Sequence, residues 1–429
     1  MNKLALTTAL ATIAALSAAP AAAQYTKGAD SRPIVVEVPN KTTAEDTKRK
    51  PEAPADPNAI KLSKKASKAI IELQKAVQAN DAATIPAKLA AAQAVAETPA
   101  DRYAIGRLQL NVAQAAKNTE AAVLAADYLA SANYLPKEKV AGLYNSLGID
   151  FFNAKNTARA TQMFQKALTV DPNNAESMRL LAETQNASGN SADAVATFQK
   201  AMQQASATGQ KLPEEAYKRA VSTAYGAKSP AAVDLSRHWV TAYPNADSWH
   251  NAVAIYRNMM SPEVESTLDL LRLLRAVNAL QTSGDYTLYA TAAAEQGNFA
   301  EAQSVINEGL ANKKIDSSSS LARDIINGLK SKPQATIAEI EVAAKNAKTP
   351  ASMIVVGNRF YGSGNYARAA ELYRSAAAAG GNASLANLHL GMALARSGDK
   401  AGAAAALNAV TGNYAGVAKY WLLYVNQSG

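Results

Sequence analysis

The 429-residue sequence contains no cysteine, only three histidines and few aromatic residues. Without cysteine the chain forms neither disulfides nor thiolate metal sites, and we expect no bacterial lipoprotein anchor, which needs a cysteine at the cleavage site. Aromatic side chains make up only 6% of the residues, and the β-branched clusters that favour strands are few. The 48% hydrophobic fraction is dominated by alanine, the residue with the highest helix propensity. We therefore expect an all-α protein with a sizeable core.

The beginning of the chain has the three-part pattern of a secretory signal peptide. Lys3 is followed by an apolar run from Leu4 to Leu16 and then by small residues up to Ala23. This run is shorter than the ~20 residues that span a bilayer. We predict a signal peptide at residues 1–23 and a periplasmic mature protein with no transmembrane segment. Secretion into the medium is the alternative location.

Residues 24–58 are rich in proline, charged and small polar residues. Prolines cannot donate backbone hydrogen bonds, and such a composition buries little apolar surface, so we expect a flexible lead. The formal net charge of +9 arises from scattered lysines and arginines. A solvated basic surface explains it, with attraction to anionic lipid, polysaccharide or an acidic partner as the alternative. We expect no nucleic-acid partner, because an exported protein seldom meets one.

From residue 59 onward, apolar residues recur at helical spacing with short breaks. Ala66, Ile70, Leu73 and Val77 follow steps of three and four residues, which define one face of a helix. Prolines and glycines interrupt the pattern about every dozen residues. Helical hairpins are the expected structural unit.

Large and small residues recur at fixed positions in a window of 34 residues. In the window from Ala141 these are Leu147, Gly148, Phe151, Ala160, Phe164, Ala167 and Pro172, and one period later Leu181, Ala182, Gly189, Ala194, Phe198 and Ala201. The same positions are occupied in windows that begin at Ser283, Pro350 and Ser384. The pattern resembles the tetratricopeptide repeat (TPR), with five clear units covering about 170 residues.

The resemblance implies a right-handed superhelical solenoid of TPR-like helical hairpins with a concave inner face. Small residues are expected where the two helices of a hairpin cross, and Gly-Asn pairs such as Gly189-Asn190 at the turns. The expected segments are degenerate hairpins at 59–140, two clear units at 141–208, drifted hairpins at 209–282, and C-terminal units with a closing helix at 283–429. The departures between about 205 and 282 mark either a break between two sub-arrays or drifted repeats.

No pattern in the sequence indicates catalysis. The histidines His238, His250 and His389 are not at metal-binding spacing, and neither a Gly-x-Ser-x-Gly elbow nor a phosphate-binding glycine loop occurs. We therefore predict a non-enzymatic protein with no cofactor and no metal. A hydrolase with an unrecognised site is a further hypothesis.

In TPR arrays the concave groove is lined mainly by positions 2, 5, 9, 12 and 13 of each unit. Carried over to this sequence, the resemblance implies a partner-binding groove that includes Asn145, Phe152, Arg179, Asn358, Tyr361, Leu388, Met392 and Arg396. Apolar, amide and guanidinium groups together suit an extended or helical peptide. Alanine at Tyr361, Met392 and Arg396 is expected to abolish partner capture without loss of helicity.

The leading hypothesis is a non-catalytic periplasmic scaffold for protein–protein interaction that binds a segment of a protein or peptide partner in this groove. The alternative is an envelope or polysaccharide-export accessory that binds glycan or peptidoglycan. It is motivated by the basic charge and by Tyr243, Trp249 and Tyr256, which could form an exposed aromatic group. Aromatic residues at repeat spacing more often belong to the core, and this is the alternative interpretation of the three.

Overall fold

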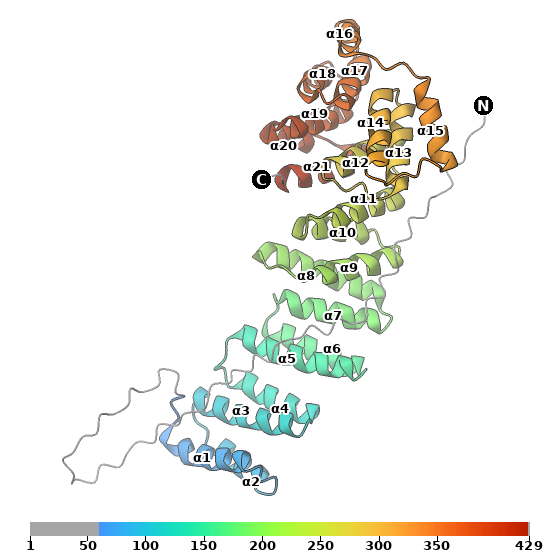
Figure 1. The fold of residues 1–429 in the computed structure, drawn as a ribbon. Helices are drawn as coiled ribbons and strands as arrows, with labels where there is room; N and C mark the ends of the chain where they lie inside the picture. The colour runs from blue at the N-terminus through green and yellow to red at the C-terminus, as the bar shows by residue number, and fades with distance from the viewer. Residues whose placement is uncertain (1–59, 428–429) are drawn as a thin grey trace, which may run out of the picture. The chain divides into compact units, whose positions relative to one another are not determined.

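The computed structural model describes residues 60–427, and this part of the chain is entirely helical (Figure 1). It contains 21 α-helices and one short 3-10 helix, with no strand among the described residues. The predicted all-α fold is therefore confirmed. The predicted signal peptide (1–23) and the whole of the predicted proline-rich lead (24–58) lie outside the described residues.

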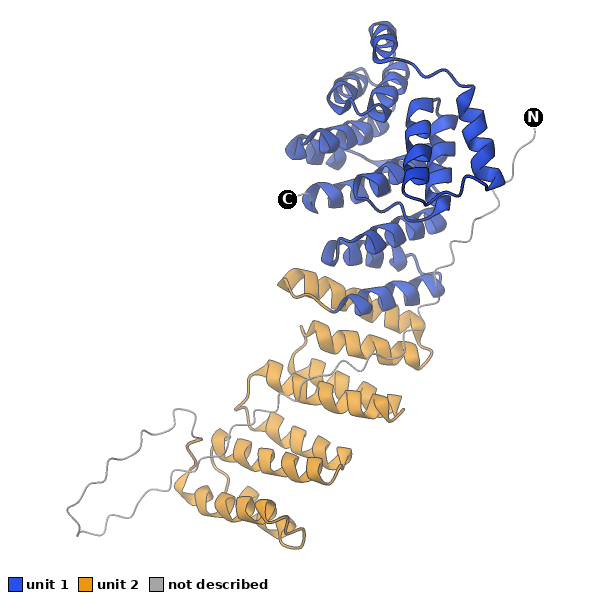
Figure 2. Cartoon of the chain, in the orientation of Figure 1, with its two compact units in different colours: residues 1–13, 213–429 blue, residues 14–212 orange. Residues whose placement is uncertain are grey.

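The chain forms two compact units, and the boundary between them lies between Leu212 and Pro213 (Figure 2). The first unit along the chain ends at Leu212 and is the one labelled unit 2 and drawn orange in Figure 2. Its described part contains eight helices: α1 (Lys64–Gln78), α2 (Ile85–Ala94), α3 (Pro99–Ala115), α4 (Thr119–Ser131), α5 (Lys137–Asn153), α6 (Thr157–Val170), α7 (Ala175–Ala187) and α8 (Ser191–Thr208). Consecutive helices pack as the hairpins α1–α2, α3–α4, α5–α6 and α7–α8. The segment boundaries expected within this unit stay a prediction.

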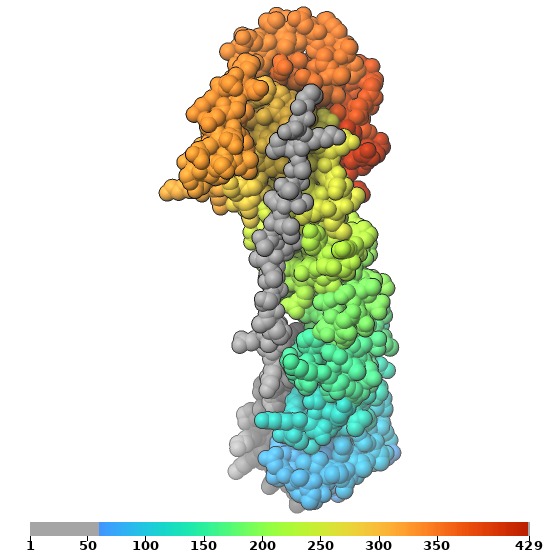
Figure 3. Space-filling model, turned by 90° about the vertical axis from the view of Figure 1, so that its right-hand side faces the viewer, coloured from blue at the N-terminus to red at the C-terminus, as the bar shows by residue number. Residues whose placement is uncertain are grey.

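The unit that begins at Pro213 contains the remaining helices: α9 (Glu214–Gly226), α10 (Ala231–Ala242), α11 (Ala246–Met260), α12 (Val264–Ala276), α13 (Ser283–Glu295), α14 (Phe299–Ala311), α15 (Ser320–Lys330), α16 (Ile337–Asn346), α17 (Pro350–Gly362), α18 (Tyr366–Ala378), α19 (Ala383–Ser397), α20 (Lys400–Asn408), the 3-10 helix η1 (Gly412–Tyr414) and α21 (Ala415–Gln427). Hairpins form from α9–α10, α13–α14, α17–α18 and α19–α20. The segment between α14 and α17, orange in Figure 3, leaves Leu321, Ile337 and Val342 exposed.

Local sequence signals explain where the helices begin. Asn156 and Asn174 precede α6 and α7, and each side-chain oxygen accepts a hydrogen bond from the backbone N–H three residues later. Helices α3 and α17 begin at Pro99 and Pro350, whose fixed φ and missing N–H suit the first helical position.

No helix among residues 60–427 has the length and apolarity that crossing a bilayer requires.

The small residues of the repeat lie where paired helices touch. A Cβ atom added to Gly148 would lie 2.4 Å from the ring of Phe164, and one added to Gly357 would lie 2.6 Å from the ring of Tyr373. Only glycine permits this approach, since real Cβ contacts below 3.0 Å do not occur. The sequence-based explanation of these positions is confirmed. Gly189 also has the left-handed backbone expected at the turn, with φ of 83°.

The unit of residues 213–427 also contains contacts between helices that are far apart in sequence. Helix α21 packs against α10 and α12 as well as against its neighbours α19 and α20, and α14 contacts α17. In a simple solenoid each repeat contacts only its neighbours. The C-terminal hairpins therefore fold back onto earlier helices of their own unit.

Candidate functional site

Most of the predicted groove residues of the C-terminal hairpins lie inside the unit of residues 213–427. Leu388 and Met392 on α19 are 0% exposed, and Asn358 and Tyr361 on α17 are also buried. Arg396 is half-buried and donates a hydrogen bond to the Tyr366 hydroxyl at 3.1 Å. A partner cannot reach the four buried side chains in this conformation, and their role in binding stays a prediction.

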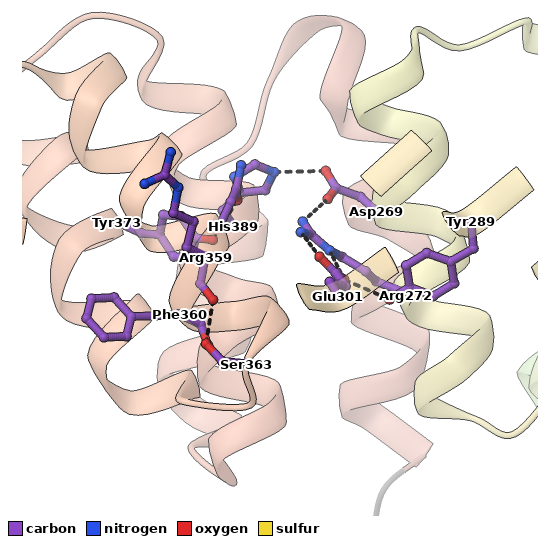
Figure 4. Close-up of polar contacts among 10 residues, drawn as sticks. Asp269, Arg272, Tyr289, Glu301, Arg359, Phe360, Ser363, Tyr373 and His389 are labelled. Carbon is purple, nitrogen blue, oxygen red and sulfur yellow. Dashed lines mark hydrogen bonds and ion pairs between the residues drawn. The ribbon is translucent and has the colours of Figure 1, made fainter. Parts of the chain in front are cut away.

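A buried polar network lies where α12–α14 meet α17–α19 (Figure 4). The guanidinium of Arg272 donates to the two carboxylate oxygens of Glu301 at 2.9 and 2.7 Å and to Asp269 Oδ1 at 3.1 Å. The Nε2 atom of His389 lies 3.0 Å from Asp269 Oδ2. Tyr289 donates its hydroxyl to Glu301 at 2.9 Å. Charged and hydrogen-bonding groups from four helices are thus joined without solvent between them.

Two of the predicted groove residues are held by this network, one of them through Tyr373, whose ring lies 5.2 Å from the ring of His389. The Arg272 guanidinium lies 4.7 Å from the centre of the Tyr361 ring, a cation–π contact. The Tyr373 hydroxyl donates to Asn358 Oδ1 at 2.7 Å. The side chains that the repeat pattern assigns to a groove therefore attach α17 to the rest of its own unit.

The pKa shifts in the network follow from burial and pairing. Burial alone would lower the pKa of Arg272, but Glu301 and Asp269 raise it well above its ordinary value. Burial raises the pKa values of Tyr289, Tyr361 and Tyr373. At neutral pH the network thus combines a fixed guanidinium charge with neutral phenols, which suits it to holding helices together.

In the first unit, the predicted residues lie on α5 and α7, which contact each other. We use the term α5–α7 face for a set of side chains at helical spacing on these two helices: Asn145, Ile149, Phe152, Glu176, Arg179, Glu183 and Asn186. Arg179 lies between two carboxylates, donating through Nε to Glu176 at 2.7 Å and through Nη1 to Glu183. Burial alone would lower the Arg179 pKa, but the two glutamates raise it. This arginine is thus fixed in one position.

The remaining side chains of the α5–α7 face are amides and apolar groups. Asn145 is 4% exposed, and its Oδ1 has no hydrogen-bond partner among the residues that the structure describes. Ile149 and Phe152 pack against the core of the unit but stay partly exposed, as does Asn186. The face therefore offers apolar surface and amide groups side by side.

The hypothesis that the aromatic group near residue 250 is exposed is wrong for Trp249 and Tyr256, whereas Tyr243 is partly exposed. Trp249 is 3% and Tyr256 5% exposed. Tyr243 packs edge-on against Tyr217, with ring centres 5.7 Å apart. The spacing of Trp249 and Tyr256 reflects the apolar core face of α11 rather than a surface for stacking sugars.

The histidines occupy separate environments. His250 Nε2 lies 3.1 Å from Asp285, His389 belongs to the network described above, and burial lowers the pKa of His238. Within residues 60–427 no three histidine, aspartate or glutamate side chains gather in a way that could hold a metal ion.

Two structural features were not predicted from the sequence, although a residue pattern indicates each of them. Lys117 and Lys155 occupy left-handed turns between helices, with φ of 51° and 62°. The repeat pattern predicts a glycine at such a turn. The tripeptide Ala-Lys-Asn at 116–118 and 154–156 would have aligned the hairpin α3–α4 with α5–α6. Asp269 and Arg272 stand one turn apart in the leucine-rich α12, a position where buried charges need partners.

Comparisons with known proteins agree with the helical-repeat architecture. Models of the tetratricopeptide repeat family match residues 151–212 and 357–418. No curated protein matches the chain. Similar solved structures include a tetratricopeptide repeat protein from Parabacteroides merdae (14% identity, 59% of this chain and 98% of that chain covered, TM-score 0.27) and PilF from Pseudomonas aeruginosa (14%, 63% and 90%, 0.22).

The two matched stretches include the hairpins α7–α8 and, in full or in large part, α17–α18 and α19–α20. In two of them the glycine at the helix crossing touches the large residue of the partner helix, as Gly357 does with Tyr373 and Gly391 with Leu407. Residues 151–212 and 357–418 of the chain are thus tetratricopeptide repeats.

Proposed function

We propose that this protein is a non-catalytic scaffold of the bacterial periplasm that binds a segment of a partner protein on the α5–α7 face. The proposal rests on one observation above all. On the α5–α7 face, Ile149, Phe152 and Asn186 are partly exposed although Asn145 and Arg179 are buried, whereas Leu388, Met392 and Tyr361 in the other unit are buried.

The chemistry of the α5–α7 face suits a peptide segment. The partly exposed amide of Asn186 can donate a hydrogen bond to a partner's main chain and accept one from it. The partly exposed Phe152 and Ile149 supply apolar contact area for a partner side chain. Arg179 is already fixed by its two glutamates, so a partner that contacts it loses little conformational entropy.

The periplasmic location follows from the signal-peptide pattern of residues 1–23. It is tested by fractionating cells that express a C-terminally tagged chain and by determining the N-terminus of the mature protein. A mature N-terminus at Gln24 in the periplasmic fraction supports the location. An uncleaved protein in the cytoplasm contradicts it.

Binding is tested by in-cell crosslinking followed by affinity purification of the tagged protein and mass spectrometry. The test variant combines Phe152→Ala with Asn186→Ala, which truncates two partly exposed side chains. Because Phe152 also packs against the core, circular dichroism must show that the double variant is folded. The matched control is Leu124→Ala on α4, because Leu124 is 64% exposed and lies outside the α5–α7 face. We expect one dominant protein partner with the wild type and the control, and at least a tenfold loss with the double variant. Equal recovery from all three proteins would refute the site.

A further inference from the structure

Helix α21 has the residue pattern of a peptide that binds in a groove. Val417, Tyr420, Trp421 and Val425 are all buried, and their spacing of three and four residues places them on one face of the helix. Lys419 and Asn426 are exposed on the opposite side. The helix thus has an apolar binding face with two adjacent aromatic residues.

The face of α21 is recognised by main-chain groups of three earlier helices. The Tyr420 hydroxyl donates to the carbonyl oxygen of Ala252 on α11 at 3.2 Å, and Trp421 Nε1 donates to that of Asp269 on α12 at 3.2 Å. Gln427 donates to the carbonyl oxygen of Val240, which lies in the last turn of α10. These bonds join residues 152 to 187 positions apart. A helix that only capped the last hairpin would not reach them.

Side chains complete a specific site for Tyr420. The Tyr256 ring packs edge-on against it at 5.4 Å, and the Arg237 guanidinium lies 5.6 Å from its ring centre. The Ser236 hydroxyl is 3.4 Å from the Tyr420 hydroxyl. Burial raises the pKa of Tyr420 to about 12, so the phenol stays neutral and able to donate at physiological pH.

The segment before α21 is held to the start of α19 by a few exposed polar contacts: the Thr411 N–H donates to the Ser384 hydroxyl oxygen at 3.1 Å, and the Asn382 amide donates to the Tyr414 hydroxyl oxygen at 3.2 Å. Thr411, Gly412 and Asn413 are three consecutive exposed residues, and Gly412 has a left-handed backbone with φ of 64°. A change of backbone conformation there would move α21 while the hairpin α19–α20 stays intact.

We propose that the surface formed by α10, α11 and α12 is a binding site for an amphipathic helix with a tyrosine followed by a tryptophan, and that α21 occupies it as an intramolecular ligand. A partner protein that presents a helix with the same pair of aromatic residues competes with α21 for this surface. The site lies in the unit of residues 213–427 and does not depend on the α5–α7 face.

The first step of the test releases α21 in the full-length protein. A Cβ atom at Gly416 would lie 2.1 Å from the hydroxyl oxygen of Tyr256, and this tyrosine is buried and stacked, so Gly416→Leu should force the helix off its site. The matched control is Gly328→Leu on α15, where an added Cβ meets nothing within 4 Å. Hydrogen exchange of residues 417–425 reports the release. A second release variant combines Tyr420→Ala with Trp421→Ala.

The second step measures binding of a fluorescein-labelled peptide of residues 415–427 by anisotropy. We expect both release variants to bind it at least tenfold more tightly than the wild type and the Gly328→Leu control, whose sites are occupied. A peptide with alanine in place of Tyr420 and Trp421 should not bind.

Three results would overturn the inference. The first is fast exchange of α21 in both release variants with no gain in peptide binding. The second is loss of helices α13–α20 in both variants, which would make α21 an inseparable part of the core. The third is persistent protection of α21 without its two aromatic residues.

Discussion

Replacing Arg272 by methionine should destabilise the unit of residues 213–427 by about 3–5 kcal/mol, the cost of leaving buried charges unpaired. Its guanidinium is 1% exposed and contacts two carboxylates, those of Asp269 and Glu301, which are 0% and 2% exposed. Methionine fills a similar volume but provides no positive charge. Both carboxylates then stay buried with hydrogen bonds only from His389 and Tyr289.

A neighbouring arginine on the same helix provides the matched control. Arg275 donates to Glu308 at 2.8 Å, but the two side chains are 30% and 33% exposed. Water and salt screen this pair, so Arg275→Met should cost only ~0–1 kcal/mol. The difference between the two variants isolates the effect of burial.

The assay is urea unfolding followed by tryptophan fluorescence. The chain's three tryptophans, Trp239, Trp249 and Trp421, all lie in the unit that begins at Pro213, so the signal reports this unit alone. Circular dichroism follows both units together. Equal midpoints for Arg272→Met and Arg275→Met would refute the reasoning that the network holds the C-terminal hairpins in place.

Three further predictions concern particular residues. Folding lowers the pKa of Asp101: burial alone would raise it, but backbone N–H groups of Ser63, Thr98 and Glu97 donate to the carboxylate. The stability this provides is complete above the ordinary value of about 3.9 and is lost as pH falls through the lowered value, so Asp101→Asn should reduce the acid dependence of unfolding measured by circular dichroism. Met392→Ala should cost about 2–5 kcal/mol in urea unfolding because Met392 has no exposed surface; a loss below ~1 kcal/mol would contradict its burial. Gly148→Ala should cost about 1–3 kcal/mol through overlap with Phe164, whereas Gly142→Ala, with free space around it, should stabilise by about 0.5–1 kcal/mol; thermal unfolding distinguishes the two.

The repeat pattern could be predicted from sequence because it depends on local geometry. Gly357 and Tyr373 are 16 positions apart, close enough for a 34-residue window to capture their contact. The hairpin α3–α4 was not aligned because its turn uses Lys117 in place of glycine. Lys117 is exposed, and local hydrogen bonds at the end of α3 hold its turn: the Lys117 N–H donates to the carbonyl oxygen of Gln114 at 3.0 Å, and the Asn118 N–H donates to that of Ala113 at 2.9 Å.

The repeat pattern in the sequence could not predict that the groove residues of the C-terminal hairpins are buried. A TPR position specifies which face of a helix a side chain lies on, but not what covers that face. Tyr361 and Met392 have the spacing of groove residues, and the fold-back of α17–α21 onto α10–α14 decides that they are buried. The expectation that alanine at these sites would leave the fold intact is accordingly replaced by a prediction of destabilisation.

By itself, the sequence determined the helical hairpins, the glycines at their crossings and the caps at their ends, because each depends on residues within about one repeat. The tertiary structure decided the contacts between distant helices, namely the network around Arg272 and the docking of α21. These contacts join residues up to 187 positions apart. They depend on how successive hairpins stack, and small rotations at each hairpin add up along the chain, so no local pattern specifies which distant surfaces meet.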